Sequence, residues 1–217
     1  KSKKYQVFLI LIILCGSSST FGKDLERIVN LNKKWKFAIG DYQKWASPTF
    51  NDNDWESIYV PSEWENQGFQ SYDGYAWYRT DFTIDAFYDR DNIYLNLGYI
   101  DDVDEVFING VRVGFSGNFP PNYWTAYFAN RIYNVPREII NFQGNNVIAV
   151  RVFDSQLAGG IVSGDIGIYV NQSSFDVEYD LAGIWDFKIG DNPDWSRKDL
   201  ITEDWIKTMV PGFWRYI

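Results

Sequence analysis

Histidine is absent from this chain, and cysteine occurs only once, as Cys15. The absence of histidine excludes catalytic triads with an imidazole base and zinc sites with imidazole ligands. A single cysteine excludes an internal disulfide bond and a cluster of thiolate ligands. Together these absences remove histidine-based chemistry and sites built from several cysteines from consideration.

Positive charge is also scarce, because 20 lysines and arginines face 29 acidic residues, for a net charge of −9. An acidic surface repels phosphate groups, so nucleic acid is excluded as a natural partner. Hydrophobic residues make up 46% of the 217 residues and aromatic residues 19%. This content is ample for a packed core and fits one large or two small domains.

Long apolar runs are missing, and the short run Val7–Leu14 follows three lysines at the start of the chain. Eight apolar residues are too few for a permanent membrane span, so residues 1–22 are predicted to be a signal peptide that is cleaved after Gly22. Lipid attachment at Cys15 and a buried N-terminal strand are the alternatives. We expect an exported protein, which is periplasmic, extracellular or lipid-anchored.

A stretch near the start of the chain is repeated 150 residues later, where LNKKWKFAIGDYQKW (31–45) becomes LAGIWDFKIGDNPDW (181–195). Twelve of the 34 positions from Leu31 to Trp64 are identical at this offset, and they include Trp35, Trp45, Trp55 and Trp64. Chance would give about two identities, so the repeat is real and its period is that of a domain. We expect a first domain over residues 23–178, and the truncated start of a second copy over 179–217.

Alternation of apolar and polar residues indicates β-strands throughout the first unit. Ile93, Leu95 and Leu97 lie on one face of NIYLNL, and Asn109–Gly110 between two apolar runs favours a type I′ hairpin turn. Only PREIINF (136–142) is typical of a short helical turn. Short strands at regular spacing predict an all-β, antiparallel jelly-roll sandwich.

Clustered carboxylates at Asp101, Asp102 and Asp104 are candidate ligands for a structural calcium ion. The alternative is an acidic turn that leads into a strand. Glycoside hydrolysis needs two carboxylates that face each other about 5–9.5 Å apart, and neighbours in one turn rarely do so. No catalytic residue is therefore assigned, and the chain by itself is not expected to be an enzyme.

Aromatic and acidic residues in three loop segments are candidates for carbohydrate binding, because rings stack on sugars and polar groups bind hydroxyls. The candidates are Tyr72, Asp73 and Trp77 in 66–79, Tyr123 and Trp124 in 118–128, and Asp154 in the glycine-rich segment 153–167. Alternatively, the rings close the end of the sandwich, a buried ion pair of Arg79 holds the first loop, and the glycines approach a neighbouring domain.

The stretches DGYAWYRTDFTI (73–84), LNLGYIDDVDEVFINGVRVGFSG (95–117) and GNNVIAVRV (144–152) resemble the N-terminal sugar-binding domain of glycoside hydrolase family 2. That family contains β-galactosidases and β-glucuronidases, and the domain has a galactose-binding-like jelly-roll fold. The stretch IDDVDEVFING also resembles the jelly-roll module of sialate O-acetylesterases, and similar modules occur in exported sensors. The resemblance covers roughly residues 35–170.

The resemblance implies a non-catalytic carbohydrate-binding or scaffold module of an exported glycan-processing protein. In family 2 enzymes the two catalytic glutamates lie in a separate barrel domain, so the resemblance transfers no catalytic residue. A loop that matches residues 71–77 helps to shape the active site in those enzymes. Alternatives are an accessory domain of a glycosidase or a carbohydrate esterase, and the ectodomain of a sensor. The expected partners are carbohydrate and neighbouring domains of the same protein.

Overall fold

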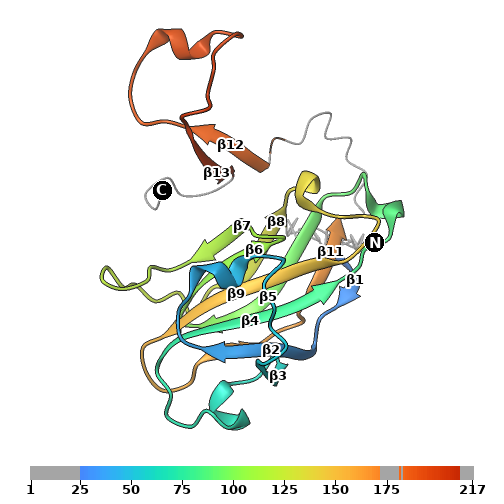
Figure 1. The fold of residues 1–217 in the computed structure, drawn as a ribbon, viewed down its shortest axis with the longest axis vertical. Coiled ribbons are helices and arrows are strands. Elements are labelled where there is room, and N and C mark those ends of the chain that lie inside the picture. Colours follow the sequence, from blue (N-terminus) through green and yellow to red (C-terminus); the bar gives the residue numbers. More distant parts are fainter. Residues whose placement is uncertain (1–24, 172–180, 182, 211–217) are drawn as a thin grey trace, which may run out of the picture.

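The computed structural model describes residues 25–171, 181 and 183–210, which form an antiparallel β-sandwich and a separate β-hairpin (Figure 1). The predicted signal peptide, Cys15 and the expected boundary at 178/179 lie outside the described residues. All strand pairs are antiparallel, and the described helices are single 3₁₀ turns. The predicted all-β sandwich is therefore confirmed.

Two sheets pack face to face. The first sheet contains β1 (Leu25–Asn30), β5 (Ile93–Asp101), β8 (Asn130–Val135), β10 (Gly160–Ser163) and β11 (Gly167–Asn171). The second sheet contains β2 (Lys33–Ile39), β3 (Glu56–Val60), β4 (Gly74–Phe82), β6 (Val103–Ile108), β7 (Val111–Ser116) and β9 (Asn146–Asp154), in the order β3-β2-β4-β9-β6-β7.

Short 3₁₀ turns punctuate the connections between strands. They are η1 (Gln43–Ala46), η2 (Trp64–Gln67), η3 (Ala86–Tyr88), η4 (Arg137–Ile139) and η5 (Pro193–Ser196). The turn η4 lies within the segment for which a helical turn is predicted. Within the described part of the chain, no helix is both long and apolar enough to cross a membrane.

The core lies between the sheets and follows the predicted alternation. Ile93, Leu95 and Leu97 of β5 are fully buried, and they face Ile148 and Val150 of β9 within one apolar cluster. The turn between β6 and β7 has positive φ at both Asn109 (51°) and Gly110 (82°), as a type I′ turn requires. Sequence periodicity therefore gives the inward and outward faces of these strands correctly.

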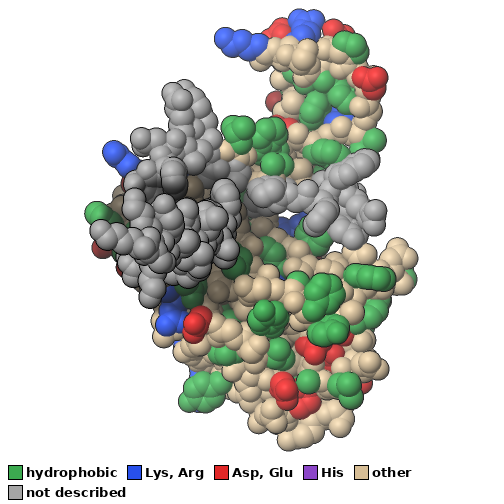
Figure 2. All heavy atoms as spheres, turned by 180° about the vertical axis from the view of Figure 1, so that it is seen from behind, with side chains coloured by type: hydrophobic (Ala, Val, Ile, Leu, Met, Phe, Trp, Pro, Cys, Tyr) green, Lys and Arg blue, Asp and Glu red, His purple; other side chains and the backbone are tan. Residues whose placement is uncertain are grey.

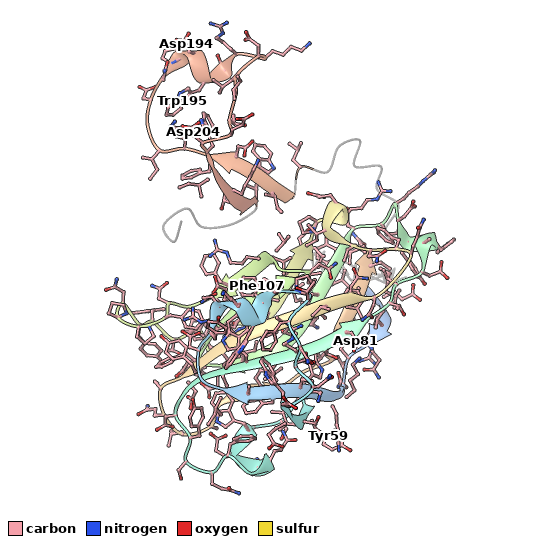
Figure 3. All side chains as sticks on the ribbon, in the orientation of Figure 1. Tyr59, Asp81, Phe107, Asp194, Trp195 and Asp204 are labelled. Carbon is pink, nitrogen blue, oxygen red and sulfur yellow. The ribbon has the colours of Figure 1, made fainter. Side chains whose placement is uncertain are left out.

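A second, smaller apolar cluster covers the outer face of the second sheet. Trp77, Ala149 and Phe107, of which Figure 3 labels Phe107, are buried there together with Ala46 of η1. Arg79 is also buried on this face, where its Nε donates to Asp52 Oδ2 at 2.7 Å. The segment that contains η1 therefore converts an outward-facing strand surface into a second core.

The separate hairpin consists of β12 (Gly183–Phe187) and β13 (Ile206–Val210). Gly183 pairs with Val210 as Lys33 pairs with Val60, which is the same register at an offset of 150 residues. The ring centroids of Trp195, which Figure 3 labels, and Trp205 lie 5.2 Å apart, as those of Trp45 and Trp55 lie 4.9 Å apart. The two hairpins thus share local structure as well as sequence.

Candidate functional site

The candidate site lies at the end of the sandwich where the chain leaves the first sheet and enters the second. Asp101 is the last residue of β5, and Val103 begins β6 after the single connecting residue Asp102. The backbone N–H of Asp102 donates to the carbonyl of Phe153 at 3.2 Å, next to Asp154 at the end of β9. Strand pairing therefore brings Asp154 beside two acidic residues that lie more than fifty positions earlier.

Three loops meet around this connection between β5 and β6. Thr125 Oγ1 donates to Asp102 Oδ1 at 2.5 Å, and the hydroxyl of Tyr123 lies 3.0 Å from Ser155 Oγ. On the other side, the N–H of Gly159 donates to the Glu65 carboxylate of η2 at 3.1 and 3.2 Å. These contacts place segments 64–73, 118–129 and 155–159 at one end of the sandwich.

Asp102 is held in one orientation by hydrogen bonds. Its Oδ2 accepts from the backbone N–H of Ser155 at 3.0 Å and from Ser155 Oγ at 2.8 Å, while Oδ1 accepts from Thr125. Burial raises the pKa of Asp102, but hydrogen bonds from Thr125, Tyr123 and Ser155 outweigh burial and lower the pKa to about 2. Asp102 is therefore ionised at neutral pH.

Asp101 and Asp154 lack comparable stabilisation. Burial, followed by the hydrogen bond and the charge of Asp102, raises the pKa of Asp101 to about 7. Burial also raises the pKa of Asp154 to about 7, with further contributions from the charges of Asp102 and Asp101. Each of the three residues offers a ligand atom, and these atoms all lie within 4.8 Å of one another. The cluster therefore carries a net negative charge at neutral pH.

The structure does not bring Asp104 together with the other two candidate metal ligands. Asp104 is fully buried, its Oδ1 accepts from Arg131 Nε at 2.8 Å, and its Oδ2 accepts from the Tyr133 hydroxyl at 2.6 Å. Both carboxylate oxygens of Asp104 are therefore engaged within the protein. The structure places Asp154 in the acidic cluster instead.

The structure does not place Trp77 beside the other candidates for ligand binding, because Trp77 is fully buried beneath η1. Its ring stacks on Phe107 with centroids 5.8 Å apart, and its indole N–H donates to Asp41 Oδ1 at 3.3 Å. A loop that covers a strand cannot be recognised from the alternation within that strand. The other five candidates for ligand binding stay predictions.

Those other candidates differ in exposure. Trp124 is 67% exposed and Asp73 is exposed, whereas Tyr72 and Tyr123 are half-buried and Asp154 is fully buried. Tyr72 packs against the main core, and its hydroxyl donates to the carbonyl of Tyr75 at 2.7 Å. Tyr72 therefore shapes its loop, while Asp73 and Trp124 are open to solvent.

A hollow of about 410 Å³ lies at this end of the sandwich. It is lined by Glu65, Gln70, Ser71, Asp73 and Leu157. Two carboxylates, an amide and a hydroxyl thus surround one apolar side chain. The hollow adjoins the acidic cluster, since the charge of Glu65 acts on Asp101 and that of Asp73 acts on Asp154.

A second hollow, of about 450 Å³, was missed by sequence reasoning. It lies over β6 and β7 and is lined by Glu105, Arg112, Phe115, Gly117, Asn118, Phe119 and Asn122. Arg112 Nη1 donates to Glu105 Oε1 at 3.1 Å, and the Arg151 guanidinium lies 4.1 Å from the centroid of Phe119. The run FSGNFPPN (115–122) supplies most of the lining residues and is visible in the sequence. Glu105 comes opposite this run only through the pairing of β6 with β7, which the sequence does not show.

On the face seen in Figure 2, hydrophobic side chains of the described residues lie singly or in small groups between polar atoms. Polar hollows and the acidic cluster are therefore features of the described residues that are suited to chemistry or binding.

Comparison with known proteins identifies the family. Residues 40–157, which are more than half of the chain, match the domain family described as "Beta-galactosidase second all-beta domain". The chain belongs to this family. The resemblance to an all-β domain of glycoside hydrolase family 2 enzymes is thereby confirmed, while its position as an N-terminal sugar-binding domain stays a prediction.

Among curated proteins, the β-galactosidase BoGH2A of Bacteroides ovatus is 30% identical over 174 residues, which cover 71% of this chain and 18% of that enzyme. A crystal structure of Bacteroides uniformis β-glucuronidase matches with a TM-score of 0.54 and 24% identity, over 67% of this chain and 18% of that chain. A family 2 member from Bacteroides cellulosilyticus matches with a TM-score of 0.52 and 19% identity, over 66% and 20%.

The structural matches establish the fold. The chain spans about a fifth or less of the length of these relatives. What it resembles is therefore one domain of a much longer enzyme, and its own function has to be argued from its own surface.

Proposed function

We propose that the sandwich is a carbohydrate-binding and scaffold domain, without catalytic residues of its own, in an exported glycan-processing protein of the family 2 type. The observation that carries this proposal is the 410 Å³ hollow lined by Glu65, Gln70, Ser71, Asp73 and Leu157. Its size and its mixture of hydrogen-bonding groups with one apolar side chain suit a sugar ring. Family membership supports the same reading.

Rigid anchoring of the hollow favours binding. The Glu65 carboxylate is fixed by the N–H of Gly159, and Trp64 beside it is fully buried. Side chains that are already ordered lose little entropy when a ligand binds. Asp73 is exposed and can accept hydrogen bonds from sugar hydroxyls. Tyr123 and Trp124 lie on the loop that contacts Ser155, two residues before Leu157 of the hollow.

Calorimetric titration of the 217-residue chain with neutral monosaccharides, uronic acids and short oligosaccharides tests the proposal. We expect binding in the millimolar range or tighter, and about a tenfold loss for Asp73→Asn, since a hydrogen bond to a charged group contributes about 1.5–3 kcal/mol. Asp165→Asn, at an exposed acid paired with Arg27, is the matched control and should bind as the unaltered chain does. Absence of binding to every sugar of the panel contradicts the proposal.

The proposal extends to the two ends of the chain. Residues 1–22 act as an export signal, or Cys15 carries a lipid, and residues 179–217 belong to a second copy of the sandwich domain. The shared register of β2–β3 and β12–β13 supports the second copy. Mass spectrometry of the protein recovered from cells tests the first point, because an intact, unmodified Lys1 would contradict export.

A further inference from the structure

A buried carboxylate oxygen at the end of β9 has no partner. Asp154 is fully buried, and its Oδ1 accepts from the N–H of Gln156 at 3.2 Å. Its Oδ2 has no hydrogen-bond partner among the described residues. An unpaired buried carboxylate oxygen is costly, because it has lost its water without gaining a donor. A group that is not part of the chain would remove this cost.

Among the residues that the structure describes, the surroundings of Asp154 are acidic, and the nearby cation is already paired. Asp101 and Asp102 offer ligand atoms within 4.8 Å of that of Asp154. The Arg131 guanidinium is close, but it donates to Asp104 Oδ1, to the carbonyls of Ala126 and Ala129, and to the carbonyl of Asp102. Its positive charge is therefore already committed to the buried Asp104.

We propose that Asp101, Asp102 and Asp154 bind one divalent metal ion, with calcium as the preferred ion. Calcium binds oxygen ligands at about 2.3–2.6 Å, so two ligands of one ion lie at most about 5 Å apart, and the cluster meets this limit. Three carboxylates and no nitrogen or sulfur ligand suit a hard cation. Asp101 is only half-buried, so water can complete the coordination shell.

The hydrogen bonds around the cluster are compatible with a bound ion. Thr125 donates to Asp102 Oδ1 and Ser155 donates twice to Oδ2, while the hydrogen bond between Asp101 and Asp102 needs a proton that a metal ion would displace. Thr125 and Ser155 fix the orientation of this carboxylate, as outer-shell groups do around metal ligands. Asp154 uses Oδ1 for the backbone and keeps Oδ2 free.

A bound ion would join the two sheets. Asp101 ends β5 in the first sheet, and Asp154 ends β9 in the second. Asp102 also anchors the loop of residues 118–129, because its carbonyl accepts from the N–H of Ala126 at 3.0 Å. The ion would therefore stabilise the connection between β5 and β6 and the loop that carries Tyr123 and Trp124.

A shared proton is the competing explanation. Since the carboxylates lie close together, a proton could bridge two of them, and it would occupy the same space as the ion. Metal binding would then release protons, so calorimetric titrations in two buffers with different ionisation enthalpies would give different heats. A chain with a shared proton alone would show no response to calcium.

The test uses the chelator-treated 217-residue chain, titrated with calcium chloride and separately with magnesium chloride at pH 7.5. We expect one equivalent of calcium to bind, with a higher midpoint of thermal unfolding, and at least a tenfold loss of affinity in Asp154→Asn and in Asp101→Asn. Asp165→Asn is the control and should bind calcium unchanged, because Asp165 is an exposed acid outside the cluster. Tighter binding of magnesium would overturn the preference for calcium.

Loss of calcium binding in a variant can be told apart from loss of folding. Asp154→Asn removes one of three like charges, so in chelator this variant should unfold at the same temperature as the unaltered chain in chelator, or at a higher one. Terbium luminescence of the unaltered chain, excited through its aromatic residues and displaced by calcium, supplies a readout that needs no variant. No response to millimolar calcium, or calcium affinity that survives both substitutions, overturns the site.

Discussion

Two tryptophans in the same local structure provide a matched test of what burial contributes. The indole N–H of Trp35 donates to the carbonyl of Leu31 at 2.9 Å, and that of Trp185 donates to the carbonyl of Leu181 at 2.8 Å. Both residues also occupy the same position in their hairpins. Their exposure differs, because Trp35 is 1% exposed and Trp185 is 46% exposed.

We expect Trp35→Ala to lower the free energy of unfolding of the sandwich by about 3–5 kcal/mol, as large-to-alanine changes in cores do. Trp35 packs in the main core together with Phe37 and Ile58, so its removal leaves a cavity. Trp185→Ala removes an equivalent hydrogen bond but opens no buried cavity, so it should cost less than about 1 kcal/mol. The difference between the two variants isolates burial from the hydrogen bond.

Urea unfolding, followed by far-ultraviolet circular dichroism and by tryptophan fluorescence, measures both variants against the unaltered chain. The slope of the unfolding free energy with urea should be unchanged, which shows that the same surface is exposed. Equal losses in the two variants, or a loss below 1 kcal/mol for Trp35→Ala, would refute the reasoning from burial.

Three further predictions follow from particular contacts. Asp104→Asn should lower the free energy of unfolding by about 3–5 kcal/mol, because the buried Arg131 charge loses its counter-ion, and a urea titration that shows under 1 kcal/mol would contradict this. Gly159→Ala should cost about 1–3 kcal/mol, because a Cβ there would lie 2.2 Å from the indole ring of Trp64; an unchanged midpoint of thermal unfolding would argue against this close approach. In chelator, the midpoint should fall as pH rises from 5 to 8. The folded pKa of Asp101 and of Asp154 is raised to about 7, against about 3.9 when unfolded, so the stabilisation is complete below about pH 4 and is lost as pH passes 7. Asp154→Asn should flatten that fall, and a rising midpoint would have the wrong sign.

Sequence patterns predicted the strands well because strand structure depends on near neighbours. The alternation of Ile93, Leu95 and Leu97 gave the inner face of β5, and Asn109–Gly110 gave the turn between β6 and β7. The repeat of 31–45 at 181–195 predicted the start of a second copy, and the structure adds that the hairpins β2–β3 and β12–β13 share one register. These features need only the local period of side chains and the φ angles that Asn and Gly tolerate.

Predictions for the site were less accurate because they depended on distant parts of the chain. Asp104 lies two residues from Asp102, but it is captured by Arg131, which is 27 positions later. Asp154 joins Asp101 and Asp102 only because β6 pairs with β9. Neither event leaves a mark in the spacing of the acidic residues.

The sequence by itself determined the all-β architecture, the faces of the strands, the repeated sequence stretch and the acidic, histidine-free composition. Only the tertiary structure decided which carboxylates share a site and which aromatic rings reach solvent. Trp77 illustrates the difference, since its place on the outer face was readable but its burial under η1 was not. The physical reason is that alternation sets the direction of a side chain, whereas burial depends on which other segment covers it.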